Sequence, residues 1–132
     1  GNLSVTGTST LTGDVAAGDD VTVNGWLTIP STTVTAQSYT ISSTGKASAY
    51  LVDGTTTEPM RIWLPTGAAD GTMIMVKDLD RNAGTNNMLV DTEGAETVDG
   101  SATYTANANG EAIVVVYDAG TTDWVIFGGY AE

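Results

Sequence analysis

The first chemistry that the sequence offers is a set of oxygen ligands spaced two residues apart. Asp78, Asp80 and Asn82 follow a D-x-D-x-N spacing, which can direct alternate side-chain oxygens at one Ca²⁺. A calcium loop of the EF-hand type needs Gly at its sixth position and Glu at its twelfth, but here Gly84 comes one place late and the Glu is missing. The favoured interpretation is an Asx-rich turn whose side chains bind backbone amides. We therefore expect no cofactor, and these three residues are the metal candidates if a cation binds.

Four carboxylates between residues 91 and 99 invite comparison with glycoside hydrolases. They are Asp91, Glu93, Glu96 and Asp99. Glycoside hydrolysis needs two carboxyl groups at a fixed separation inside a cleft, and the spacing of turn residues predicts neither. The chain also has no His and no Cys, which removes the commonest general base and the thiolate nucleophile. We expect no catalytic residues and no enzyme activity, and we expect these acids at solvated loop tips.

Aromatic and amide side chains are the better candidates for binding a ligand. Proteins bind sugars with flat aromatic faces beside polar groups, because a sugar presents apolar C–H patches next to its hydroxyls. Trp63 and Trp124 lie inside predicted strands, so we expect both to pack in the core or between subunits. Residues near predicted loop apices are the ligand-binding candidates. They are Tyr104, Asn107, Asn109 and Asn86.

The charge of the chain excludes two classes of partner. The chain has sixteen Asp and Glu residues but only four Lys and Arg residues, so its formal net charge is −12. Such a field repels nucleic-acid phosphates and anionic bilayers, and we expect no nucleic-acid partner. No stretch approaches the roughly 18 apolar residues of a membrane span, so we expect no membrane insertion. The chain begins at Gly1 without an initiator Met, and we expect it to be a piece of a longer polypeptide.

The elements that must position these residues are strands. Short apolar runs separated by Gly, Asn, Asp and Thr are typical of antiparallel strands joined by turns, and no stretch repeats apolar residues at helical spacing. We expect strands at 38–41, 49–52, 60–64, 73–76, 88–90, 113–117 and 124–127. The sequence therefore predicts an all-β fold, with a head domain of antiparallel strands over residues 31–132.

Residues 1–30 form a separate segment that contains an internal repeat. The pattern Leu-Ser-Val-Thr-Gly at 3–7 returns as Val-Thr-Val-Asn-Gly at 21–25. Each unit has too few apolar side chains to bury a core alone, and repeat architectures need several stacked units. Identical chains around a threefold axis would supply the missing units, so we expect a β-repeat shaft in an intertwined homotrimer. The alternative is a flexible Gly/Thr linker.

The order of these features carries a family resemblance. Leu-Pro at 64–65 ends one strand, Lys-Asp at 77–78 ends another, and Asn-Ala-Gly-Thr-Asn at 82–86 and Thr-Val-Asp-Gly at 97–100 follow before a last strand with Trp124. This order resembles the small distal β-domain of bacteriophage tail-fibre and other virion appendage proteins, and the N-terminal repeat is similar to their shaft repeats. Leu79, Asp80 and Arg81 depart from the Gly-containing turn expected after the Lys-Asp pair.

The resemblance implies a thin β-stalk followed by a β-sandwich or jelly-roll-like head, a location in the virion and a role in attachment. We expect a non-enzymatic homotrimer, bound to other virion proteins, that presents a head for binding a receptor such as a host cell-surface glycan. Three copies per fibre would turn weak contacts into firm adhesion. The alternative is a structural capsid or tail decoration fibre with no external ligand. A depolymerase module and a bacterial adhesin are further options that the sequence leaves open.

Overall fold

The computed structural model describes residues 6–7, 10, 22–42, 48–54 and 57–130. All regular secondary structure in these residues is strand, which confirms the all-β prediction. The strands are β1 (Ser31–Val34), β2 (Ser38–Thr40), β3 (Ala49–Val52), β4 (Met60–Leu64), β5 (Met73–Asp78), β6 (Met88–Thr92), β7 (Thr97–Val98), β8 (Thr103–Ala106), β9 (Ala112–Asp118) and β10 (Asp123–Tyr130). No helix in the described residues is suited to crossing a membrane.

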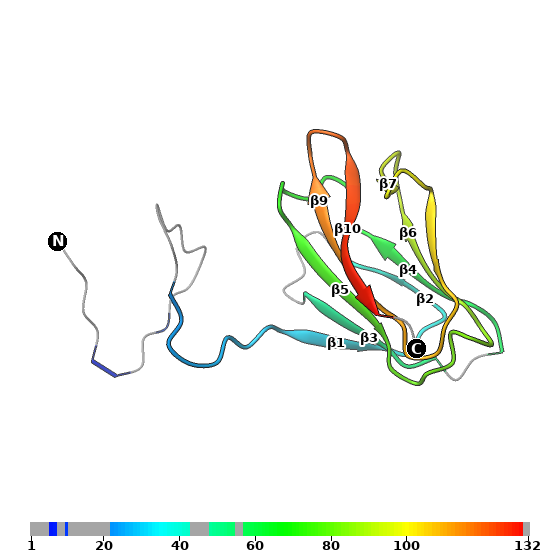
Figure 1. Cartoon of the computed structure of the whole chain (residues 1–132), viewed down its shortest axis with the longest axis horizontal. Helices are drawn as coiled ribbons and strands as arrows, with labels where there is room; N and C mark the ends of the chain where they lie inside the picture. Colours follow the sequence, from blue (N-terminus) through cyan, green and yellow to red (C-terminus); the bar gives the residue numbers. More distant parts are fainter. Residues whose placement is uncertain (1–5, 8–9, 11–21, 43–47, 55–56, 131–132) are drawn as a thin grey trace.

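The predicted shaft lies mostly outside the described residues. Residues 22–30 are described, contain no strand and run in an extended course away from the head (Figure 1). The internal repeat falls largely on residues of which the structure says nothing. The boundary between shaft and head therefore stays a prediction, although β1 does begin at Ser31.

The strands form two facing sheets that the chain visits in turn. The six-stranded sheet has the order β1-β3-β5-β9-β10-β7, and the four-stranded sheet has the order β2-β4-β6-β8. From β1 to β6 each strand lies in the opposite sheet to the one before it, so the chain winds in solenoid-like coils (Figure 1). The parallel pairs β1/β3, β3/β5, β2/β4 and β4/β6 result from this winding.

The prediction of an antiparallel head is therefore wrong for the pairs that the first six strands make with one another and for β7/β10, which are all parallel. It holds for β5/β9, β9/β10 and β6/β8, which close the C-terminal side of the sheets. Alternation of apolar residues predicts which face a side chain occupies but not which strand is its partner. Asp53 and Gly54 follow β3 and begin the crossing to the opposite sheet, where β4 pairs with β2 and β6.

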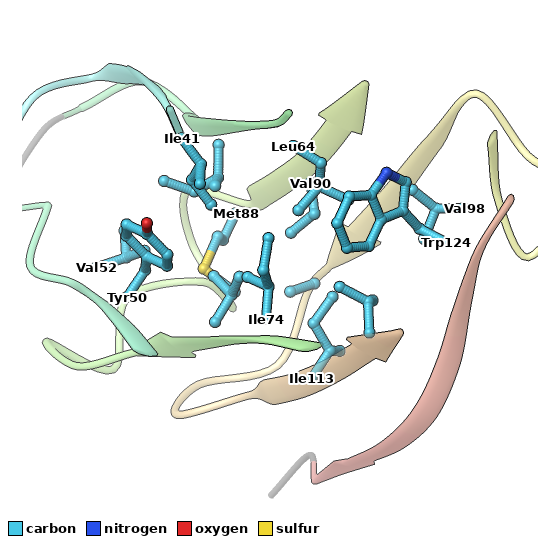
Figure 2. Close-up of a cluster of buried hydrophobic side chains, with 14 of the residues drawn as sticks. Ile41, Tyr50, Val52, Leu64, Ile74, Met88, Val90, Val98, Ile113 and Trp124 are labelled. Atoms are coloured by element: carbon cyan, nitrogen blue, oxygen red, sulfur yellow. The ribbon is translucent and has the colours of Figure 1, made fainter. Parts of the chain in front are cut away.

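The core lies between the two sheets and contains the side chains that point inward from both (Figure 2). Trp124 is fully buried at one end of it beside Val98, and its ring centroid lies 5.1 Å from that of Tyr117. The expectation that Trp124 packs in the core is thus confirmed. Each sheet also has an outer face, formed by the side chains that alternate with the buried ones. The outer faces of the two sheets differ in the kinds of side chain that they carry.

Candidate functional site

Asp78, the first metal candidate, binds backbone amides of two loops. Its side chain is 2% exposed at the end of β5. Its Oδ2 accepts hydrogen bonds from the amides of Ala83 at 3.0 Å and Gly110 at 2.8 Å, and its Oδ1 accepts one from Asn82 at 3.3 Å. The favoured interpretation of this stretch, a turn in which Asx side chains bind amides, is confirmed for Asp78. The carboxylate ties the loop after β5 to the loop between β8 and β9.

Asp80, the second metal candidate, shares a hydrogen bond with Asp78. Partial burial, this hydrogen bond and the negative charges of Asp78 and Asp53 raise the pKa of Asp80 to about 6. Burial alone would raise the pKa of Asp78 too, but the hydrogen bonds that it accepts outweigh burial and lower it. The pair therefore holds a proton on Asp80 under mildly acidic conditions. Within the described residues, no group of three acidic ligands is arranged for a metal ion.

The pair predicts a pH-dependent stability. The pKa of Asp80 is higher in the folded chain than its ordinary value of 3.8, so the folded state loses stability relative to the unfolded state as pH rises through about 6. Asp80→Asn removes the acid and keeps a hydrogen-bond donor for Asp78. At pH 8 we expect this variant to have a higher free energy of unfolding than the wild type, by on the order of 1 kcal/mol, and therefore a higher urea midpoint. Equal gains at pH 8 and below pH 4 would contradict the assignment.

Tyr104 and Asn107, two of the ligand candidates, are tied to a buried carboxylate. Glu111 is 5% exposed, accepts a hydrogen bond from the Tyr104 hydroxyl, and accepts two more from the amides of Asn107 at 2.9 Å and Ala108 at 3.0 Å. Burial and the bond to Glu111 raise the pKa of Tyr104 to about 12. Tyr104 is thus a packing and hydrogen-bonding residue of this loop, whereas the Asn107 residue is exposed.

Asn109 and Asn86 lie in the same pair of loops. The Asn109 Oδ1 accepts a hydrogen bond from the amide of Gly84 at 2.8 Å, and the Asn86 amide donates to the Asn82 carbonyl at 2.9 Å. The structure therefore brings the predicted ligand residues and the metal candidates together at one end of the sheets. The Asp78 and Asn109 side chains join the two loops, whereas Tyr104 and Asn107 bond to Glu111 within the segment from β8 to β9. A ligand-binding role for this loop end stays a prediction.

The carboxylates between residues 91 and 99 do not form one group. Asp91 lies on β6 and forms an ion pair with Arg61 of β4, with side-chain exposures of 8% and 37%. The expectation of a solvated loop tip is therefore wrong for Asp91. Glu96 accepts a hydrogen bond from the Gly67 amide at 3.1 Å, and Asp99 accepts one from the Ile126 amide at 2.8 Å.

The outer face of the four-stranded sheet carries the most varied set of polar and aromatic groups. Two rows cross its strands, and the pairing register places their members side by side. We call this surface the polar face. It consists of Ser38 and Thr40 on β2, Arg61 and Trp63 on β4, Leu89 and Asp91 on β6, and Thr103 and Thr105 on β8.

Trp63 is held at the centre of the polar face by its neighbours. Its indole Nε1 donates to the Ser38 hydroxyl at 3.1 Å, and the Arg61 guanidinium lies 5.2 Å from the centre of its ring. Arg61 is held in turn by Asp91, which also accepts a 2.7 Å hydrogen bond from the Thr103 hydroxyl. These contacts fix the orientation of an aromatic ring that remains partly exposed to solvent.

A hollow adjoins the polar face at the end of β2. It has a volume of about 300 Å³. Thr40, which pairs with Trp63 across the strands, lines it together with Glu93 and Thr66. The Thr40 hydroxyl donates to the Glu93 carboxylate at 3.1 Å. Hydroxyl and carboxylate groups thus lie next to the ring, where they could bind the hydroxyls of a ligand stacked on the polar face.

Trp63 is the residue whose place was predicted least well. The sequence predicted packing in the core or between subunits. In the described chain Trp63 lies on the outer face of its sheet, so the core position is wrong, and packing between subunits stays untested. The signal was present, because Met60, Ile62 and Leu64 alternate with Arg61 and Trp63. An Arg on the same side of a strand indicates the solvent face. Ser38, Asp91 and Thr103 belong to other strands. Their position near Trp63 could be predicted only with knowledge of which strands pair and in which register.

Comparison with known proteins adds no relative. No protein-family model matches the chain, and a search of curated proteins gives no match. The functional argument therefore depends on the residues and the geometry of this chain.

Proposed function

We propose that this chain is a non-enzymatic segment of a bacteriophage virion fibre, which attaches the particle to a glycan of the bacterial surface. In this proposal residues 1–30 form a shaft, residues 31–132 form a sandwich-like head, and three chains intertwine. Support comes from the resemblance in strand and turn order, and from an acidic surface suited to a dispersed extracellular particle. The observation that carries the proposal is the partly exposed, oriented ring of Trp63 on the polar face.

Sugar recognition explains the arrangement around Trp63. The flat ring can pack against the C–H face of a pyranose, while neighbouring hydroxyl, carboxylate and guanidinium groups bind its hydroxyls. Thr40 and Asp91 flank the ring on the neighbouring strands, Thr103 lies beyond Asp91, and all three take part in hydrogen bonds or an ion pair. A site held in place by its own contacts loses little conformational entropy on binding. Because the site is shallow, one copy binds weakly.

Firm attachment then comes from repetition. Three polar faces on one trimer bind a repeating polysaccharide at the same time, so that the second and third contacts form at high effective concentration. No chemical step is required of the chain. A decoration fibre with no external ligand, the competing function, would need neither an exposed ring nor polar groups oriented around it.

Substitution of Trp63 tests the proposal. The purified chain is applied to an array of bacterial surface polysaccharides that includes lipopolysaccharide, capsule and teichoic acid. We expect binding to at least one of them, and we expect Trp63→Ala to weaken that binding about 30-fold per site, as for the loss of a central aromatic contact. Trp63→Phe keeps a ring and should lose much less. Circular dichroism checks that each variant is folded.

Two controls separate this site from the other possibilities. Asn107→Ala alters the exposed loop end and should leave binding unchanged; loss of binding in this variant, with Trp63→Ala unaffected, would move the site to the predicted loop residues. Failure of the wild type to bind any polysaccharide or host cell, together with binding to the virus particle, would favour the decoration fibre. Release of reducing ends from a bound polysaccharide would instead indicate a depolymerase.

A further inference from the structure

Part of the outer face of the six-stranded sheet is apolar and at least partly exposed. Adjacent strands β5, β9 and β10 present it, and their register places Met73 beside Val116 and Val116 beside Val125, with Met75 beside Val114 in the next row. We call this surface the apolar face. It consists of Met73, Met75, Val114, Val116, Val125 and Phe127. Contiguous exposed apolar surface of this kind marks an interaction site.

Phe127 is the most exposed member of the apolar face. Its side chain is 77% exposed, and those of Met73 and Val125 are 47% and 38% exposed. The strand register shifts between Ile126 and Gly128, so Phe127 is an extra residue opposite β9. By alternation from the buried Trp124, Phe127 shares the outer side with Val125. A bulge that turns a large apolar side chain towards solvent indicates a contact to be made.

We infer that the apolar face is the surface through which copies of this chain assemble around a threefold axis. The inference rests on the homotrimer of the proposed function and specifies its interface. Each copy carries a net charge of −12, so two copies repel one another unless the surfaces that meet are free of carboxylates. The six residues of the apolar face include no carboxylate. Asp118 and Asp123 border it where β9 turns into β10, and Asp99 borders it beside Ile126, so these charges lie at its rim.

The other outer face does not meet this condition. The polar face carries Asp91 and lies next to Glu93, and assembly through it would bury charged groups at a cost. The apolar face and the polar face lie on opposite sides of the molecule, so assembly through the first leaves the second open to a ligand.

A second uncovered apolar region supports assembly with copies of the same chain. Residues 22–30 contain no charged residue, and Trp26, Leu27 and Ile29 are 98%, 72% and 43% exposed. This segment leads directly into β1, an outermost strand of the six-stranded sheet. A threefold axis brings together the corresponding regions of all three chains, so one assembly can cover the apolar face and the apolar lead-in segment.

Native mass measured by light scattering tests the inference. We expect the wild type at three times the 13.5 kDa of one chain. Phe127→Glu places a carboxylate at the centre of the apolar face and should give a folded monomer. Thr105→Glu places the same charge on an exposed strand residue of the opposite sheet and should remain trimeric. A wild-type monomer, or a trimer in all three proteins, would overturn the inference.

Methionine oxidation gives a test that needs no substitution. Met73 is 47% exposed in the single chain, whereas Met88 is 2% exposed in the core. In the wild-type trimer we expect peroxide to oxidise Met73 at the slow rate of Met88; oxidation of Met73 at the rate of a free methionine would contradict a covered apolar face.

Polysaccharide binding by the same proteins distinguishes a wrong interface from a wrong attachment role. A monomeric Phe127→Glu chain should keep weak binding through Trp63, whereas a trimer that binds no polysaccharide leaves the interface valid and the attachment role wrong.

Discussion

Replacing Asp78 with Ala is expected to lower the free energy of unfolding by about 4 kcal/mol, a large part of the stability of a small domain. The side chain is buried and accepts hydrogen bonds from the amides of Asn82, Ala83 and Gly110. Its removal leaves these donors without their acceptor and releases the two loops from one another. Urea unfolding at pH 7, followed by circular dichroism, measures the change.

Asp118→Ala is the matched control for this prediction. Asp118 also accepts hydrogen bonds from its turn, at 2.9 Å from the Gly120 amide and 2.7 Å from the Thr121 hydroxyl, but water can replace it there. We expect a much smaller loss for Asp118→Ala, and equal losses would contradict the anchoring role of Asp78. Because hydrogen bonding lowers the pKa of Asp78 below its ordinary value of 3.8, its stabilising effect is present at neutral pH. The effect should fade as strongly acidic conditions protonate the folded carboxyl.

Replacing Trp124 with Ala is expected to cost about 4 kcal/mol, within the usual range for a buried aromatic residue. The side chain is fully buried, packs against Tyr117, and lies where β7 and β10 close the end of the core beside Val98. The cavity left behind would remove contacts from both sheets. Urea unfolding again gives the measurement.

Trp124→Phe separates packing from hydrogen bonding at this position. Among the described residues, the buried indole Nε1 of Trp124 has no hydrogen-bond partner. Phe removes this unsatisfied donor while it keeps an aromatic ring in the core, so the loss should be only about 1 kcal/mol. A loss as large as that of Trp124→Ala would indicate that the indole nitrogen has a stabilising role.

Seven of the ten strands in the described residues could be predicted because their signals are local, whereas β1, β7 and β8 were missed. The ranges 49–52 and 60–64 match β3 and β4, and the other predicted strands overlap observed ones with ends shifted by a few residues. The alternation of Met60, Ile62 and Leu64 with Arg61 and Trp63 does match the buried and outer faces of β4, although the expectation for Trp63 did not use it. Side-chain pattern along a strand is set by burial, and burial is encoded in the residues themselves.

The arrangement of the strands could not be predicted in the same way. A strand that pairs in parallel with one a full coil away shows the same alternation as one that belongs to a hairpin. Thr40, Trp63, Asp91 and Thr103 form one row although they are spread over more than sixty residues. The polar face therefore exists only because the pairing register of β2, β4, β6 and β8 places these residues side by side. Tyr104, Asn107 and Asn109 are close in sequence, and the Asn109 side chain joins their loop to the loop that holds Asn86.

The most direct test of the attachment role is to observe Trp63 while the chain binds a bacterial surface polysaccharide. The chain has three Trp residues, so 5-fluorotryptophan labelling gives three ¹⁹F resonances, which single Trp→Phe variants assign. On titration with the polysaccharide that binds best, the account predicts a saturable shift of the Trp63 resonance and none for the buried Trp124. Binding that leaves the Trp63 resonance unmoved, or the lack of any polysaccharide that binds, would contradict the account.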